Sequence, residues 1–104
     1  AEEAGDEIGV AEVQRVRALA GLRGRDYTAA LKRAETGRAA ALKCGSVLLA
    51  AECSAIAALA LRALGRTGEA ATRKAETEDG FRALGAVGLL DRLGRDWEQA
   101  SPLH

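Results

Sequence analysis

The chain has 104 residues, a length that fits one domain or part of one. Apolar residues make up 48% of the chain but aromatic residues only 3%, so we expect a core of many close contacts between small side chains. The 15 basic and 15 acidic residues give a net charge of +0, which argues against a surface dedicated to nucleic acid.

The residue types favour helices throughout the chain. Ala, Leu, Arg and Glu dominate, and the single proline, Pro102, lies near the C-terminus. The most apolar stretch, residues 47–64, is interrupted by Glu52, Ser54 and Arg62, which predicts a buried helix and not a membrane span. The chain begins without Met, which suggests a segment of a longer protein, and we expect residues 1–5 to be frayed.

An amphipathic pattern from Asp6 predicts the first helix. The positions expected to face inward are Ile8, Val13, Val16, Leu19, Ala20 and Leu22. Gly24 is the stronger end signal, and Asp26 is the expected N-cap of a second helix over residues 27–43. Gly37 lies inside this second helix, where it marks either a close helix crossing or a slight break.

Gly45 and Ser46 predict the end of the second helix and the N-cap of a third, over residues 47–64. The third helix is apolar over most of its circumference, so we place it at the centre of the domain. In the next turn Thr67 takes the N-cap position, before a fourth helix over residues 68–84. We expect the inward residues of the fourth helix to be Ala71, Ala75 and Phe81.

A shorter fifth helix is predicted over residues 87–97, followed by an extended tail over residues 100–104. Charged residues four apart mark the solvated faces of the last two helices. The expected ion pairs are Glu69–Arg73, Glu78–Arg82 and Asp91–Arg95.

The chain also repeats itself. Residues 24–36, GRDYTAALKRAET, return as residues 65–77, GRTGEAATRKAET, at an offset of about 41 residues, and the first and third helices correspond at about 42. The repeating unit is therefore a helix hairpin. We predict one all-α domain over residues 1–104, in which two antiparallel hairpins stack, about 6–44 and 46–84, and a short helix at about 87–97 caps them.

These hairpins resemble tetratricopeptide-like repeats. Tyr27, Ala30 and Ala34 look like the start of the second helix of such a hairpin, and Gly68, Ala71 and Ala75 repeat it. The chain departs from the standard repeat in its longer period, in lacking a large aromatic residue in the first helix, and in lacking a Pro that closes the repeat. The resemblance implies a right-handed solenoid fragment.

The longer, Ala-rich hairpin is similar to the helical-repeat region of bacterial MalT-like and LuxR-type ATP-dependent transcriptional regulators. The stretch Phe81-Arg82-Ala83-Leu84-Gly85-Ala86 looks like the one that precedes a final short helix in those proteins. This resemblance implies a cytoplasmic, bacterial regulatory protein of which the chain is one part.

No motif predicts a catalytic, cofactor-binding or metal site, and we expect no enzyme activity. Cys44 and Cys53 lack the spacing of zinc ligands; we expect reduced, packed cysteines, with a disulfide as the alternative. His104, the only histidine, is terminal, which argues against His-based catalysis. The turn at residues 65–68 follows no predicted strand and lacks the GK[ST] ending of a phosphate loop.

Three residues are candidates for partner binding. Arg25 and Arg66 follow the turn glycines in both copies; we expect them to be solvated or paired, or else to contact an acidic partner. Trp97 is either a core or cap residue or a recognition anchor. The leading hypothesis is a non-enzymatic interaction or effector-sensing module that binds a protein, a neighbouring domain or a second copy between its hairpins. The alternatives are a small-molecule pocket in the helix groove and a structural dimerising bundle.

Overall fold

Five α-helices make up the part of the chain that the computed structural model describes, residues 4–100, with side chains described from residue 7. The helices are α1 (Ala4–Arg23), α2 (Tyr27–Lys43), α3 (Val47–Ala63), α4 (Thr67–Ala83) and α5 (Val87–Gln99). Residues 4–100 contain no strand, so the predicted all-α fold is confirmed. Residues 1–3 and 101–104, which include the predicted tail and His104, lie outside the described residues.

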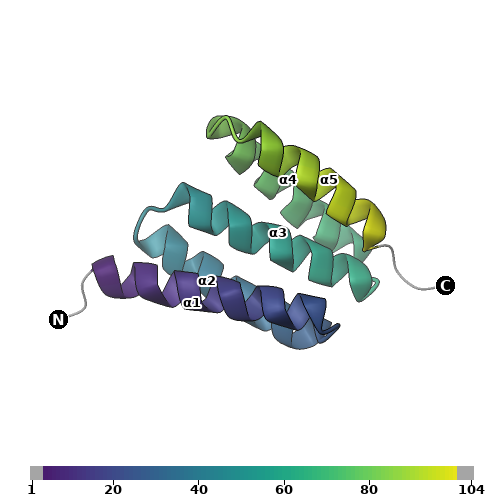
Figure 1. The fold of residues 1–104 in the computed structure, drawn as a ribbon, viewed down its shortest axis with the longest axis horizontal. Helices are drawn as coiled ribbons and strands as arrows, with labels where there is room; N and C mark the ends of the chain where they lie inside the picture. The colour runs from purple at the N-terminus through teal and green to yellow at the C-terminus, as the bar shows by residue number, and fades with distance from the viewer. Residues whose placement is uncertain (1–3, 101–104) are drawn as a thin grey trace.

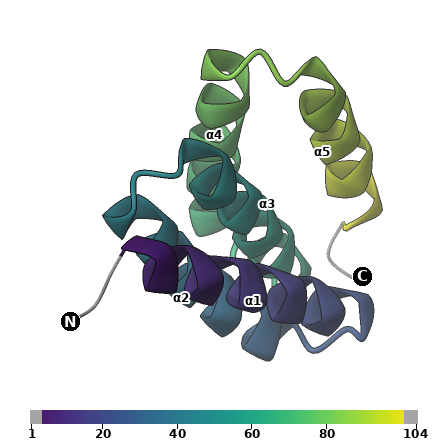
Figure 2. The ribbon, with the colours of Figure 1, turned by 60° about the vertical axis from the view of Figure 1, so that its left-hand side comes forward.

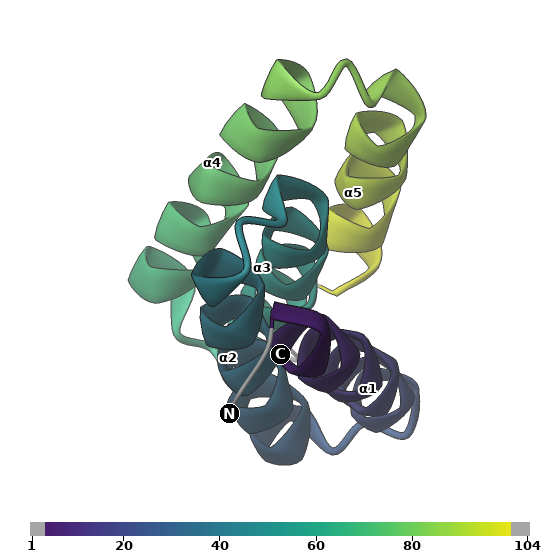
Figure 3. The same ribbon diagram turned by 90° about the vertical axis from the view of Figure 1, so that its left-hand side faces the viewer.

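The helices form two stacked antiparallel hairpins and a short fifth helix, as predicted (Figure 1). Viewed from the end of the stack, α1, α3 and α5 lie in one layer and α2 and α4 in the other (Figure 3). Helix α3 contacts all four other helices and has the largest set of buried residues, which confirms its predicted central place. Helices α4 and α5 diverge from each other along their length (Figure 2).

The four turns between helices repeat one backbone arrangement every 20 residues. Arg25, Gly45, Gly65 and Gly85 have positive φ angles of 64°, 76°, 82° and 69°. The N–H of each of these residues donates to the carbonyl three residues earlier, and the following N–H donates to the carbonyl five residues earlier. These bonds satisfy carbonyls that a helix end leaves free, and the left-handed residue ends the helix.

The first turn differs because Arg25 carries a side chain where the other three turns have glycine. For a residue with a side chain, the left-handed conformation costs about 1 kcal/mol more than it does for glycine. We therefore expect Arg25→Gly to raise the free energy of unfolding by about 0.5–1 kcal/mol, measured by urea denaturation. Gly65→Ala is the matched reverse change and should lower it by about 1 kcal/mol. An unchanged or lower stability of Arg25→Gly would contradict this account of the turn.

The structural repeat is 40 residues, not 41: α2 begins at Tyr27 and α4 at Thr67. Thr67 was predicted as an N-cap but is the first helical residue, and Arg66 precedes it as the cap. Of the three predicted inward residues of α4, Phe81 is confirmed and the two alanines are corrected in the same way. Ala71 and Ala75 are exposed, whereas the buried residues of α4 are Ala70, Thr77 and Phe81.

The apolar stripe predicted for α1 is only partly correct: Leu19 and Leu22 pack against the core as expected. Val13, Val16 and Ala20 were expected in the core but are exposed to solvent. The fully buried residues of α1 are Ala11 and Ala18. Ala11 and Ala18 pack directly against residues of α2 and α3. A valine at either position would push these helices away from α1, so small residues face the core.

Gly37 lies at a close crossing of three helices, so of the two alternatives for this glycine the structure supports the crossing. A Cβ atom at Gly37 would lie 2.8 Å from the Sγ of Cys53 on α3 and 3.1 Å from the Cβ of Gln14 on α1. Helix α2 continues through this position without a break.

Both cysteines are free. Cys53 is buried in α3, and this burial raises the pKa of its thiol to about 11, so the thiol is protonated at neutral pH. Cys44 lies at the C-cap of α2, where its Sγ donates to the carbonyl of Ala41 at 3.3 Å. The structure therefore agrees with the interpretation of two reduced, packed cysteines.

Candidate interaction groove

Residues of α1, α3 and α5 line a groove. It consists of two adjoining hollows of about 360 and 140 Å³ that share wall residues, and both hollows open to solvent. The shared wall residues are Leu19, Leu22, Leu59, Arg92 and Asp96. Three helices from different parts of the chain therefore build one continuous surface, which we call the groove.

The floor of the groove is apolar. Leu19 and Leu22 are one helical turn apart on α1 and lie on one face of it, partly buried against the core. Helix α3 adds Ile56 and Leu59, and α5 adds Leu89. These residues leave apolar area in contact with water, which a partner could cover favourably.

Charged residues of both signs border this floor. Arg15 on α1 faces Glu52 on α3, with 3.7 Å between the guanidinium Nε and the carboxylate. This Nε atom is buried and has no hydrogen bond, because the distance to Glu52 is too long for one. Arg92 and Asp96 form a second open pair on α5, at 3.9 Å. The rim can therefore take a donor or an acceptor from a bound segment.

Trp97 holds α5 in place on the second hairpin. The Arg62 guanidinium lies 4.4 Å from the centre of the indole ring, and Lys74 Nζ lies 5.4 Å from it. The Nε of Arg62 also donates to the backbone carbonyl of Trp97 at 2.9 Å. Cations stack favourably on the face of tryptophan. Of the two predicted roles for Trp97, the contacts support the cap and not an open recognition anchor.

Arg25 and Arg66 do not line the groove, and they are not equivalent to each other. Arg25 has the left-handed position that Gly65 has in its turn, whereas Arg66 matches Asp26 as the N-cap residue. Arg66 forms two hydrogen bonds to Glu69, of 2.7 and 2.8 Å, and these bonds lower the pKa of the Glu69 carboxyl. The Arg25 guanidinium has no ion pair within residues 7–100.

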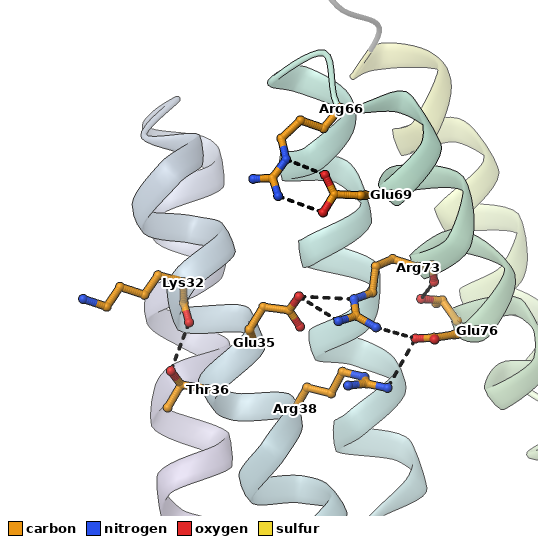
Figure 4. Close-up of polar contacts among 9 residues, drawn as sticks. Lys32, Glu35, Thr36, Arg38, Arg66, Glu69, Arg73 and Glu76 are labelled. Atoms are coloured by element: carbon orange, nitrogen blue, oxygen red, sulfur yellow. Dashed lines mark hydrogen bonds and ion pairs between the residues drawn. The ribbon is translucent and has the colours of Figure 1, made fainter.

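The opposite layer has a network of ion pairs that sequence reasoning missed (Figure 4). Arg73 on α4 binds Glu35 on α2 at 2.8 Å and Glu76 at 2.8 Å, and Arg38 on α2 binds Glu76 at 3.3 Å. Partial burial lowers the pKa of Arg73, but its hydrogen bonds to both carboxylates outweigh this effect and raise it. In the described residues no Cα atoms of α2 and α4 lie within 8 Å, so this network bridges the two helices.

The expected pairs of charged residues four apart are replaced by other pairs. Glu69 pairs with Arg66, so the predicted Glu69–Arg73 pair is wrong. On the remainder of α4, Glu78 pairs with Lys74 and Arg82 with Asp79. On α5 the pair is Arg92–Asp96 and not Asp91–Arg95. Arg73 turns towards α2, where its Nε and Nη2 atoms both donate to the same carboxylate oxygen, Oε2, of Glu35.

The described residues include no group of three or more His, Cys, Asp or Glu side chains that could hold a metal ion. No helix among residues 4–100 is long and apolar enough to cross a membrane. No protein-family model, curated protein or solved structure matches the chain. The chemistry of the groove is therefore the main guide to function.

Proposed function

We propose that the chain is a non-enzymatic interaction module that binds an amphipathic segment of a protein in the groove. The apolar floor bordered by charges of both signs carries this proposal. Recognition of an amphipathic helix or peptide needs apolar positions in a line, with polar groups beside them. The segment could belong to a separate protein or to a neighbouring domain of the same protein.

The open shape of the groove favours a polypeptide over a small molecule. A small ligand is usually buried over most of its surface in a concave pocket. Both hollows open to solvent, and they extend from Tyr27 and Arg23 at one end to Ala55 and Phe81. An elongated segment can contact the whole length of such a surface. This shape is the reason to prefer a protein partner over the small-molecule alternative.

We further propose that the module belongs to a cytoplasmic bacterial regulator, as the resemblance implies. The stretch from Phe81 to Ala86 forms the end of α4 and the turn before α5. This is the arrangement that the resemblance associates with a final short helix. In such a protein, binding in the groove would report the presence of an effector protein or the position of a neighbouring domain.

A synthetic amphipathic helix of about 16 residues, with leucines at helical spacing and both Lys and Glu beside them, provides the probe. We expect it to shift the fluorescence of Trp97, which follows the groove residue Asp96 on α5, with a dissociation constant that can be titrated. Leu22→Glu should weaken binding at least about tenfold, because a charge would then lie on the apolar floor.

Val47→Glu is the matched control, since Val47 is exposed and does not line either hollow of the groove. Circular dichroism should show that both variants remain helical. Equal binding by Leu22→Glu and the wild-type chain would refute the assignment of the groove. A failure of amphipathic peptides to bind at millimolar concentration would refute the interaction function.

A further inference from the structure

The outer side of α1 leaves a line of apolar positions without a partner. Gly9, Val13, Val16 and Ala20 follow one another at helical spacing and are all exposed; we call them the α1 stripe. The exposed fractions of Val13 and Val16 are 48% and 56%. Helix α1 lies at one end of the stack (Figure 3), and the stripe is separate from the residues of α1 that are fully buried, Ala11 and Ala18.

The internal repeat shows what such a stripe does when it is covered. The residues 40 positions later on α3 are Leu49, Cys53, Ile56 and Ala60, and all four are buried. They pack on the first hairpin: Cys53 lies against Gly37, and Ile56 packs with Ala18 and Ala34. In this fold, the equivalent face of a hairpin is therefore where another helical surface stacks.

The far end of the stack does not provide a matching surface. The exposed residues of α5 after its first turn are mainly charged or polar, namely Asp91, Arg92, Gly94, Arg95, Glu98 and Gln99. Stacking this end on the valines of another copy would bury charged groups without partners, which is unfavourable. Head-to-tail growth is therefore disfavoured.

The α1 stripe instead complements itself. If two α1 helices run antiparallel about a twofold axis between residues 14 and 15, Val13 lies level with Val16 of the second copy, and Gly9 with Ala20 of the second copy. The small residues at both ends of the stripe allow the helix backbones to approach. A twofold interface requires this property, because the same patch contributes both sides of the contact.

We propose that the chain forms a twofold homodimer through antiparallel packing of the α1 stripes of two copies. None of the four stripe residues lines either hollow of the groove. One helix pair buries less than the roughly 800 Å² per partner of a standard interface, so we expect a weak dimer whose population depends on concentration. Since the contact is apolar, added salt should not weaken it.

Sedimentation velocity of the full chain over a range of concentrations tests the proposal. We expect a monomer–dimer equilibrium in the wild-type chain, and Val16→Glu should weaken dimerisation at least about 100-fold because two charges would be buried beside valines. Val87→Glu is the matched control: Val87 is 65% exposed, but it lies in the first turn of α5, away from the stripe. Circular dichroism should show the same helix content in all three proteins.

Cysteine cross-linking tests the orientation of the two helices. In a Cys44→Ser background, in which the remaining Cys53 is buried, a mixture of the Val13→Cys and Val16→Cys variants should form disulfides between unlike chains faster than either variant with itself. A monomer at all concentrations, a dimer that survives Val16→Glu, open-ended oligomers or preferential self-linking would each overturn the proposal. A chain that dimerises but binds no amphipathic peptide would refute only the proposed function of the groove and not the proposed dimer.

Discussion

Replacing Phe81 with alanine should lower the free energy of unfolding by about 3–5 kcal/mol. Phe81 is the only phenylalanine, and just 3% of its surface is exposed. It lies in α4 and forms part of the groove wall together with Ala55 of α3 and Leu93 of α5. The large side chains near it, Ile56, Leu59 and Leu93, are themselves buried, so they cannot move far into the space that the ring would leave.

Urea denaturation followed by circular dichroism measures this change, and Phe81→Leu is the conservative control. Leucine keeps most of the apolar volume, so it should lower stability by less than about 1.5 kcal/mol. Leu84→Ala, at a residue that is 46% exposed, should change stability by less than about 1 kcal/mol. If Phe81→Ala were as mild as Leu84→Ala, the ring would not hold α3, α4 and α5 together.

The same substitution should loosen α5 before the rest of the chain. Helix α5 contacts only α3 and α4 among the described helices, and Phe81 lies where these three helices meet. Amide hydrogen exchange should therefore rise first in α5, while α2 and α3 stay protected. Uniform loss of protection would show that α5 is not a separate, weaker unit.

The helices and their ends could be predicted because their determinants are local. Gly45, Gly65 and Gly85 have positive φ, and the side chains of Asp26 and Ser46 accept the hydrogen bonds expected of N-caps. Each of these effects depends on only a few neighbouring residues. The apolar circumference of α3 likewise predicted its central position, because a helix with little polar surface must be covered on several sides.

The register of the repeat could not be predicted, because matching letters do not have matching conformations. Gly24 and Gly65 align in sequence, but the left-handed residues of the two turns are Arg25 and Gly65. This shifts the comparison by one residue, and one residue turns a helical side chain by about 100°. For this reason Ala71 was predicted to face inward, whereas the structure buries Ala70 and exposes Ala71.

The groove was predicted only as a gap between hairpins, because its residues come from three helices. Leu19 of α1 and Asp96 of α5 are far apart in sequence, and no local pattern shows that they share a wall. The same holds for the Glu35–Arg73 pair, which depends on the spacing of α2 and α4. Arg25 and Arg66 were predicted as a matching pair because they align in the sequence repeat. In the structure Arg25 is the left-handed residue of its turn and Arg66 is an N-cap, so the two are not equivalent.

Gly37→Ala should lower the free energy of unfolding by about 1–2 kcal/mol, although alanine is the better helix former. The added methyl would lie 2.8 Å from the Sγ of Cys53, a separation too short for two such atoms. Cys53 is fully buried, so its sulfur has no free space to move into. We expect the overpacking of this crossing to exceed the gain in helix propensity of about 1 kcal/mol.

A double-mutant cycle with Cys53→Ala tests whether the sulfur is the cause. Removing the sulfur opens the space that the methyl at residue 37 needs, so the two changes together should be about 1–2 kcal/mol less destabilising than the sum of the single changes. Gly94→Ala is the control for propensity alone: an added Cβ there meets no atom within 4 Å, so this change in α5 should stabilise by about 0.5–1 kcal/mol. Additive effects of Gly37→Ala and Cys53→Ala would instead place the clash on α1, at Gln14 or the carbonyl of Ala11.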